Sequence, residues 1–373
     1  MRIGITCFAG IGGSGIVATE LGKGLAGRGH DVHFICANMP FRLEDFSEHL
    51  SFHQVHLFPY PVLQHPQYDL ALASRLSEVI DEQELDIIHM HYAIPHAISA
   101  YLARQICHRP VTVITTVHGT DTRLVGLDPA YRPITRFGLE QSDGVTAVSH
   151  YLAKATCEDF TLTQQPHVIP NFVDTERFRR RKYPACYREN FARPEEKLLV
   201  HVSNMRPVKR ITDVVEVFAR VQREIPARLV FVGDGPDRLA AERLACDMQL
   251  GDRVIFAGNM SNVEQVLAIA DLFVLPSEVE SFGLAALEAM SCSTPVVAYA
   301  IGGVPEVVED GVTGMLAPLY DIEMLANSAL TILCNENRLA DMRVASRQRV
   351  ETLFNQEVGL DAYEEFYASF AKN

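Results

Sequence analysis

The chain has 373 residues, of which 48% are hydrophobic and 21% charged. This length predicts two domains, and this composition excludes a disordered or fibrous protein. The net charge of −14 argues against a general binder of nucleic acid or of anionic membranes. No apolar run is long enough to predict a membrane span, and the eight cysteines occur singly, as reduced thiols do. We therefore expect a cytoplasmic protein without disulfides.

Short runs rich in β-branched residues alternate with longer segments of helical period along the whole chain, which predicts parallel sheets covered by helices on both faces. We predict strands over residues 3–8, 32–37, 86–91, 111–117, 144–148, 198–203, 228–233, 254–257, 272–276 and 295–298. We predict helices over 15–27, 70–82, 211–224, 236–248 and 283–291, a continuous helical region from 322, and a last amphipathic stretch over 358–370. An irregular segment over 170–194 separates the two series, so the expected α/β fold has two Rossmann-like domains.

The first strand is followed by a glycine-rich turn, Gly10-Ile11-Gly12-Gly13-Ser14-Gly15, that runs into a helix. This G-x-G-x-x-G spacing allows a ligand to approach the backbone and favours an anion at the helix N-terminus. A dinucleotide-binding dehydrogenase would also need an acidic residue at the end of the second strand. That strand ends Ile35-Cys36-Ala37-Asn38 without one, so a nicotinamide-dependent oxidoreductase is kept only as an alternative.

Three features of the second half each follow a predicted strand, where open α/β sheets bind ligands. The loop after residue 203 carries three bases, Arg206, Lys209 and Arg210, which suit a diphosphate. A tight turn over 232–236 ends the next strand. Glu280 and Glu288 are eight residues apart, about 12 Å along a helix, too far for the paired acids of a glycosidase. These carboxylates are therefore predicted to hold a ligand.

The histidines raise the question of a metal site. His89 and His91 lie on one side of a predicted strand and His96 follows, but no acidic residue falls among them, so no metal is predicted. His118 follows the next strand. Four others in a proline-containing region are expected at the surface; they are His49, His53, His56 and His65.

Taken together, Glu280-x7-Glu288, the Lys209 loop, the turn over 233–236 and Asn171-x-Val173-Asp174 resemble the retaining glycosyltransferases of family four, which have the GT-B fold. The resemblance covers nearly the whole chain. It implies an acceptor-binding domain over 1–170 and 355–373, a nucleotide-sugar-binding domain over 171–354, and a C-terminal helix that crosses back to the first domain.

Carried onto this sequence, the resemblance assigns the ribose of the nucleotide to Glu288, the donor sugar hydroxyls to Glu280 and the leaving diphosphate to Lys209. Where the family commonly has an arginine five residues before the lysine, this chain has Asn204, and Arg206 is the candidate second phosphate ligand. The implied donor set is Gly13, Arg206, Lys209, Gly233, Asp234, Asn259, Glu280, Phe282, Gly283, Leu284 and Glu288. The implied catalytic residues are His118, Lys209 and Glu280, with His118 near the donor sugar C6 hydroxyl.

Segments of the first half, notably 3–7, 12–15, 40–43, 68–70, 89–96 and 115–121, are similar to a subgroup of the family that acts in bacillithiol biosynthesis. This similarity implies retaining transfer of N-acetylglucosamine from UDP-N-acetylglucosamine to the hydroxyl of L-malate, without a cofactor or metal. The implied acceptor set is Gly12, Gly13, Ser14, Tyr92, Thr116 and Arg136. A family-four enzyme with a sugar, lipid or inositol phosphate acceptor stays open as an alternative, and so does the oligomeric state, a homo-oligomer included.

Overall fold

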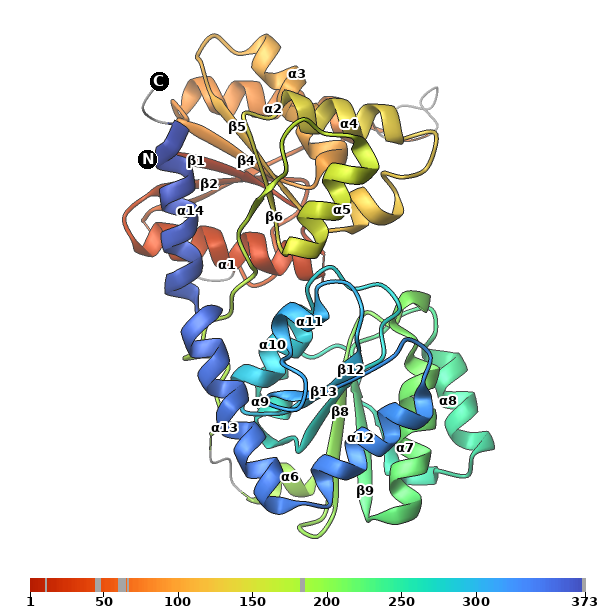
Figure 1. Ribbon diagram of the computed structural model, residues 1–373. Helices are drawn as coiled ribbons and strands as arrows, with labels where there is room; N and C mark the ends of the chain where they lie inside the picture. Colours follow the sequence, from red (N-terminus) through yellow and green to blue (C-terminus); the bar gives the residue numbers. More distant parts are fainter. Residues whose placement is uncertain (11, 44–47, 60–64, 66, 182–184, 371–373) are drawn as a thin grey trace. The chain divides into compact units, whose positions relative to one another are not determined.

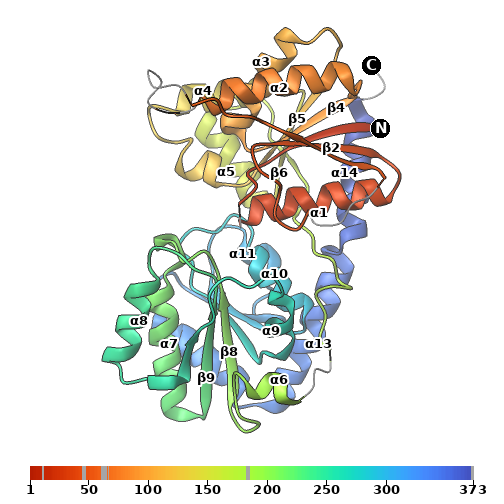
Figure 2. The same cartoon turned by 180° about the vertical axis from the view of Figure 1, so that it is seen from behind.

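The computed structural model describes residues 1–373 apart from 11, 44–47, 60–64, 66, 182–184 and 371–373. The chain forms two compact units (Figures 1 and 2). The N-terminal unit comprises Met1–Asn171 and Glu357–Asn373, and the C-terminal unit comprises Phe172–Gln356. These divisions follow residues 171 and 356, where the sequence suggested 170 and 354. Within the described residues, no helix is long and apolar enough to cross a membrane.

In the described part of the N-terminal unit, seven strands form a parallel sheet with the order β3-β2-β1-β4-β5-β6-β7. The strands are β1 (Arg2–Thr6), β2 (Asp31–Cys36), β3 (Leu50–Gln54), β4 (Ile87–His91), β5 (Thr112–Val117), β6 (Gly144–Ala147) and β7 (His167–Val168). The helices are α1 (Gly13–Gly27), α2 (Tyr68–Glu82), α3 (Ile98–Ile106), α4 (Arg132–Gln141), α5 (His150–Phe160) and α14 (Gln356–Phe370), with short helical turns η1 (Ala93–Ala97) and η2 (Thr120–Leu124).

The two faces of β4 differ in chemistry. Ile88 and Met90 pack in an apolar cluster with residues of α2 and α3. The alternate side chains point to the opposite face, where His89 Nδ1 lies 2.7 Å from the Tyr367 hydroxyl of α14. In Figures 1 and 2, α14 crosses α1 near one end of that helix. The period of two therefore directs the histidines of β4 away from the apolar cluster and toward the C-terminal helix.

The described residues of the C-terminal unit form a six-stranded parallel sheet with the order β10-β9-β8-β11-β12-β13. The strands are β8 (Lys197–Val202), β9 (Ala227–Val232), β10 (Val254–Phe256), β11 (Leu272–Leu275), β12 (Val296–Tyr299) and β13 (Gly314–Ala317). The helices are α6 (Ala185–Glu189), α7 (Ile211–Glu224), α8 (Arg238–Asp247), α9 (Val263–Ile269), α10 (Leu284–Ser291), α11 (Val304–Val307), α12 (Ile322–Leu333) and α13 (Glu336–Leu353), with turns η3 (Pro207–Lys209) and η4 (Gly251–Arg253). Helices α7, α8 and α12 cover one face, and α9 and α10 cover the other (Figure 1).

The last helix, α14, belongs to the N-terminal unit, as the expected crossing requires. Arg28, at the end of α1, forms ion pairs with Glu357, Asp361 and Glu364 of α14, the last two at 2.7 and 2.6 Å. Gly24 lets α14 approach closely, because a Cβ there would lie 2.7 Å from Leu360. Two parallel-sheet units and this helix confirm the predicted fold class.

Several elements differ from those expected. The helical region after Ile322 is interrupted, because the Asn335 side chain accepts a hydrogen bond from the Arg338 amide and begins α13 as a new helix. Strand β3 was not predicted, since its residues are partly exposed and lack an apolar run. The prediction that His53 lies at the surface is wrong: it is half-buried in β3, and its Nε2 lies 3.0 Å from His33 Nδ1.

Candidate functional site

Lys209 and Glu280, which the sequence placed in one site, form an ion pair in the C-terminal unit. Lys209 ends η3, after β8, and Glu280 lies in the loop before α10. The Lys209 ammonium donates a hydrogen bond of 2.6 Å to Glu280 Oε2, and both side chains are largely buried. A charge-assisted bond of this length fixes both groups at the carboxyl edge of the sheet, where such folds bind ligands.

The loop before α10 is held from both sides. The Glu278 amide donates to the Val208 carbonyl at 2.9 Å, and the Gly303 amide donates to the Glu280 carbonyl at 3.0 Å. Gly303 has to be glycine at this contact, because a Cβ would lie 2.2 Å from the Ser281 carbonyl oxygen. The position of the Glu280 carboxylate therefore depends on backbone contacts with two neighbouring loops.

The turn after β9 packs against the loop after β8. Gly233 has φ +111°, and a Cβ there would lie 1.9 Å from the Ser203 carbonyl oxygen. A Cβ on Gly235 would lie 2.0 Å from the Asn204 carbonyl oxygen. The Gly233 amide donates to the Gly258 carbonyl at 2.8 Å, which brings the segment containing Asn259 to the same edge. The two glycines are thus required by close backbone approach.

The polar side chains of these turns are less enclosed. Asp234 is exposed; its carboxylate accepts a 2.8 Å hydrogen bond from the Gly235 amide and lies 3.2 Å from Arg238. Asn259 is exposed too. Neither side chain is buried by the protein, so both are accessible from solvent at this edge.

The two arginines of the β8 loop have different surroundings. Arg206 is exposed and its Nε donates to Asn204 Oδ1 at 3.2 Å. Arg210 donates to both carboxylate oxygens of Asp213 at 2.7 and 2.9 Å, and its guanidinium lies 4.6 Å from the ring centroid of Tyr320. The Arg210 guanidinium is therefore held by Asp213 and Tyr320. Arg206, three residues before Lys209, is exposed and accessible to a ligand.

Helix α10 carries the remaining predicted donor residues. It begins at Leu284 after Gly283, whose φ of +100° ends the preceding loop, and Phe282 is buried. The first amides of a helix have no partner within it and attract anions. Glu288 lies one turn further and is only 6% exposed. Burial, and next the nearby Glu288 carboxylate, raises the pKa of the Cys292 thiol.

One residue of this unit that the sequence did not single out is His201, on β8. It is fully buried; its Nδ1 donates to the Val274 carbonyl at 2.8 Å, and its Nε2 lies 2.8 Å from Ser203 Oγ. Ser203 Oγ in turn accepts the Met205 amide at 3.1 Å. His201 therefore joins β11 to the loop that carries Lys209. A lone histidine in an apolar strand was the only sequence signal for it.

The glycine turn and Tyr92 lie at the corresponding edge of the N-terminal unit. The Ser14 hydroxyl donates to the Tyr92 hydroxyl at 2.9 Å. Gly15 is required by packing, since a Cβ there would lie 2.5 Å from the Phe8 carbonyl oxygen. By contrast, no described atom lies within 4 Å of a Cβ built on Gly10 or Gly12. Ile11 lies outside the described residues.

Four histidines gather beside this turn. The rings of His89 and His91 lie on one side of β4, as predicted, with centroids 4.4 Å apart. His91 Nδ1 lies 2.9 Å from His118 Nε2, and His96 Nδ1 donates to the His91 carbonyl at 2.6 Å. Burial lowers the pKa of His118 to about 3 and that of His96 to about 4. These imidazoles are therefore neutral at neutral pH.

Asp121, to which the sequence assigned no role, connects the loops after β4 and β5. Its carboxylate accepts the amides of Ala93, His118 and Gly119 at 2.8, 3.1 and 2.9 Å. Burial raises the pKa of Asp121 to about 6. The Asp121 carboxylate therefore fixes the backbone of His118.

Two residues of the predicted acceptor set lie apart from the Ser14–Tyr92 pair. Thr116 is fully buried, and its hydroxyl lies 2.6 Å from His89 Nε2 and 2.5 Å from Thr146 Oγ1. These contacts enclose the hydroxyl inside the protein, and the role of Thr116 as an acceptor ligand stays a prediction. Arg136 is exposed on α4, and its Nε donates to Glu140 at 2.8 Å.

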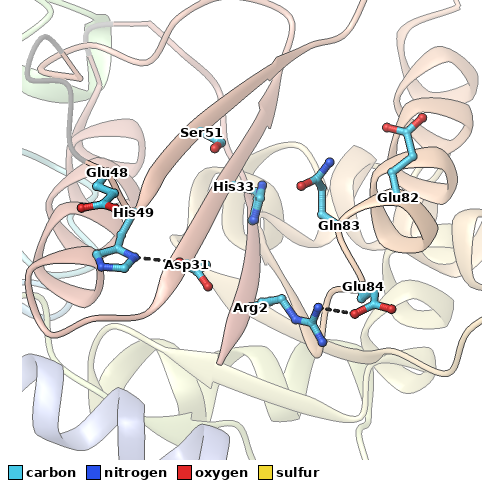
Figure 3. Close-up of a pocket in the computed structure, with 9 residues that line it drawn as sticks. All are labelled: Arg2, Asp31, His33, Glu48, His49, Ser51, Glu82, Gln83 and Glu84. Carbon is cyan, nitrogen blue, oxygen red and sulfur yellow. Dashed lines mark hydrogen bonds and ion pairs between the residues drawn. The ribbon is translucent and has the colours of Figure 1, made fainter.

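A hollow of about 300 Å³ lies at the opposite edge of the N-terminal sheet (Figure 3). Its lining includes Arg2 and Asp31, at the amino ends of β1 and β2, and it contains none of the predicted site residues. Asp31 is paired with His49 at 2.7 Å, and Arg2 with Glu84. In the described part of the chain, no cluster of three or more His, Cys, Asp or Glu is arranged to hold a metal ion.

Comparison with known proteins agrees with this architecture. A family model described as "Glycosyltransferase Family 4" matches residues 11–177, and one described as "Glycosyl transferases group 1" matches residues 187–349. The chain is 44% identical over 367 residues, 98% of its length and 96% of the relative's, to the N-acetyl-alpha-D-glucosaminyl L-malate synthase of Bacillus anthracis.

Two solved structures share the fold. The sucrose-phosphate synthase of Thermosynechococcus elongatus superposes with a TM-score of 0.83 at 24% identity, covering 100% of both chains. The Anabaena protein HepE, solved with UDP and glucose, superposes with a TM-score of 0.83 at 20% identity, covering 99% of this chain and 100% of that one. The dehydrogenase alternative is thereby set aside: the chain belongs to the family-four glycosyltransferases, which have the GT-B fold.

Proposed function

We propose that this glycosyltransferase transfers N-acetylglucosamine from UDP-N-acetylglucosamine to the hydroxyl group of L-malate, with retention of the anomeric configuration. The observation that carries the proposal is the 44% identity, over 98% of the chain, to an enzyme named for this product. In the proposed division of work, the C-terminal unit binds the donor and the N-terminal unit binds the acceptor.

Lys209 and Glu280 have the chemistry that the donor requires. When the bond from sugar C1 to the β-phosphate oxygen breaks, negative charge develops on UDP, and an ammonium already fixed by a 2.6 Å bond stabilises that charge without reorganisation. Glu280 accepts hydrogen bonds from the sugar hydroxyls. The Gly283 and Leu284 amides at the start of α10 and the exposed Arg206 contact the diphosphate, and Glu288 holds the ribose.

The donor set further includes the backbone of Gly233, together with Asp234 and Asn259 at the same edge of the sheet. Gly13 serves either substrate through its amide. These assignments rest on position, since the turn after β9 and the segment after β10 are joined by the bond from the Gly233 amide to the Gly258 carbonyl at 2.8 Å.

For L-malate we assign Gly12, Gly13, Ser14, Tyr92, Thr116 and Arg136. The space around Gly12 is open, so a carboxylate can approach the backbone amides of the turn. The hydroxyl groups of Ser14 and Tyr92 are further hydrogen-bond donors to such a carboxylate. Arg136 would supply the positive charge. Its exposed pair with Glu140 spans one helical turn, and such pairs contribute only about 0.3–0.5 kcal/mol, so a malate carboxylate can displace Glu140.

Retention follows when malate attacks on the face that UDP leaves. The bond from C1 to the phosphate oxygen breaks, the bond from C1 to the malate oxygen forms, and the malate hydroxyl proton moves to the departing phosphate. His118, neutral because burial lowers its pKa to about 3, takes no charge in this step and serves as a hydrogen-bonding group.

The test is UDP release on mixing the protein with UDP-N-acetylglucosamine and one acceptor at a time. We expect release with L-malate, and proton NMR of the product should show the α-anomer. The acceptor panel contains D-malate, glycerol and inositol phosphate. No release with L-malate together with release on another acceptor would overturn the acceptor assignment, and a β-linked product would overturn retention.

A further inference from the structure

The hydrogen bond between His91 and His118 fixes the position of a proton. His91 is the last residue of β4 and fully buried, and His118 follows the adjacent strand β5. Their rings are stacked with centroids 5.1 Å apart, and His91 Nδ1 lies 2.9 Å from His118 Nε2. Both rings are neutral, so one nitrogen donates and the other accepts, which allows two arrangements.

The second nitrogen of His91 separates these arrangements. In the first, His91 Nδ1–H donates to His118 Nε2, and His91 Nε2 carries a lone pair. In the second, His118 Nε2–H donates, and the proton of His91 resides on Nε2. Among the described residues, His91 Nε2 is buried without a hydrogen-bond partner. A buried N–H donor without a partner is rarer and more costly than an unused acceptor, so the first arrangement is favoured.

The neighbouring polar groups that the structure describes form no hydrogen bond with the ring nitrogens of His91 or His118 that would favour the second arrangement. His96 Nδ1 faces the His91 carbonyl, which can only accept, so His96 carries its own proton on Nδ1 and leaves the His91 ring alone. His89 is occupied on both sides, by the Tyr367 hydroxyl at 2.7 Å and the Thr116 hydroxyl at 2.6 Å. Asp121 contacts the backbone of His118 and not its ring.

We propose that His91 is a positioning residue that holds His118 in the Nδ1–H tautomer. His118 then presents a hydrogen-bond donor, and not an acceptor, to the substrate. No described residue forms a hydrogen bond with His118 Nδ1, which leaves this N–H for a ligand. The complementary ligand atom is a sugar hydroxyl or carbonyl oxygen that accepts; this last step rests on the proposed function, whereas the tautomer does not.

Nitrogen NMR of protein labelled with ¹⁵N-histidine measures the tautomer directly, because protonated and unprotonated ring nitrogens resonate far apart. The His118 signals are identified as those lost in His118→Asn. We expect the wild-type protein, without substrates at pH 7.5, to show a protonated Nδ1 and an unprotonated Nε2 at His118. A protonated Nε2 at His118 would overturn the proposal, whatever the variants show.

Two variants of His91 test its role. His91→Asn places an amide N–H near the original Nδ1 and should keep the tautomer and most of the activity. His91→Leu removes the donor and should shift His118 toward the Nε2–H form, with kcat/KM falling at least tenfold. Thermal unfolding shows whether each variant is folded. A folded His91→Leu protein with the wild-type tautomer contradicts the proposal; a correct tautomer without transfer to L-malate contradicts only the proposed function.

Discussion

The two units place loops at the same edge of similar parallel sheets but furnish them with different chemistry. The edge of the C-terminal unit carries full charges, with Lys209 and Glu280 paired at 2.6 Å. The edge of the N-terminal unit carries neutral imidazoles and hydroxyls, with His118, His91 and the Ser14–Tyr92 pair. The comparison shows that one architecture can supply a charged site for a diphosphate and a directional hydrogen-bonding site for a small acceptor.

The two units are expected to differ most in how much folding stability they lose at acid pH. All histidines except His201 belong to the N-terminal unit. In the four that cluster at the ends of β4 and β5, burial lowers the pKa to about 3 in His89 and His118, to about 4 in His96, and well below its ordinary value in His91. Unfolding lets each bind a proton below pH 6.5, which lowers stability by up to about 1.4 kcal/mol per group and pH unit. Asp121, whose pKa is raised to about 6, stabilises the folded state as the pH falls, but it is a single group against four.

Their net effect is a loss of up to about 4 kcal/mol per pH unit as the pH falls below 6. Hydrogen exchange at pH 7 and pH 5, corrected for the intrinsic rate, should show lost protection in β4 and β5, while β8 and β11, with only His201 between them, keep theirs. Equal loss in both units would show that the histidines do not set the acid response.

Removing the charge from the C-terminal edge should affect catalysis. Lys209→Ala should lower kcat/KM about 100- to 1,000-fold, as removal of one preorganised group facing developing charge does. Lys154→Ala is the matched control. It removes an ammonium that is exposed on α5 and has a weak ion pair, with Nζ 3.9 Å from Glu158 Oε1. Activity within threefold of wild type in Lys209→Ala would contradict the donor assignment.

A substitution in the turn after β9 should have a smaller effect, which is on the free energy of unfolding. Gly233→Ala should destabilise the C-terminal unit by about 2–3 kcal/mol, because the new Cβ overlaps a carbonyl oxygen at a positive φ. Gly258→Ala, at φ +71° with no described atom within 4 Å of the Cβ, should cost only about 1 kcal/mol. Urea unfolding of both variants measures the difference, and similar losses would mean that the contact with Ser203 is unimportant.

The smallest effects concern Arg136. Arg136→Ala should raise the KM for L-malate with little change in the KM for the donor. Glu140→Gln should lower the KM for L-malate about twofold, because it removes a competing carboxylate whose pairing contributes only about 0.3–0.5 kcal/mol. Steady-state kinetics with each substrate varied separately checks both. An unchanged malate KM in both variants would remove Arg136 from the acceptor site.

The sequence predicted the alternation of strands and helices because most inner strands are short, largely apolar runs bounded by turns, and β4 keeps apolar residues at alternate positions. It missed β3, which is partly exposed and lacks an apolar run, and it did not foresee the new helix start at Asn335. Edge strands and helix breaks are set by local side-chain bonds and neighbouring strands, which leave a weak hydrophobic pattern.

For the site, the resemblance to family four put Lys209 and Glu280 in one donor site although 71 positions separate them. The similarity to the bacillithiol subgroup implied Thr116 as a ligand, and the folded protein encloses its hydroxyl with His89 and Thr146. Sequence reasoning assigned no role to His201 or Asp121, because a buried polar residue acquires its function from partners distant in the sequence. Residues that touch a ligand leave a motif, and residues that position them often do not.

The central claim is that each unit binds one substrate, and hydrogen exchange with single ligands tests it most directly. With UDP alone, protection should increase in residues 203–210 and 277–288 and stay unchanged at the edge of the N-terminal unit. With L-malate alone, protection should increase in residues 12–16, 91–97 and 118–122. Protection by L-malate confined to the C-terminal unit, or by UDP confined to the N-terminal unit, would contradict the account.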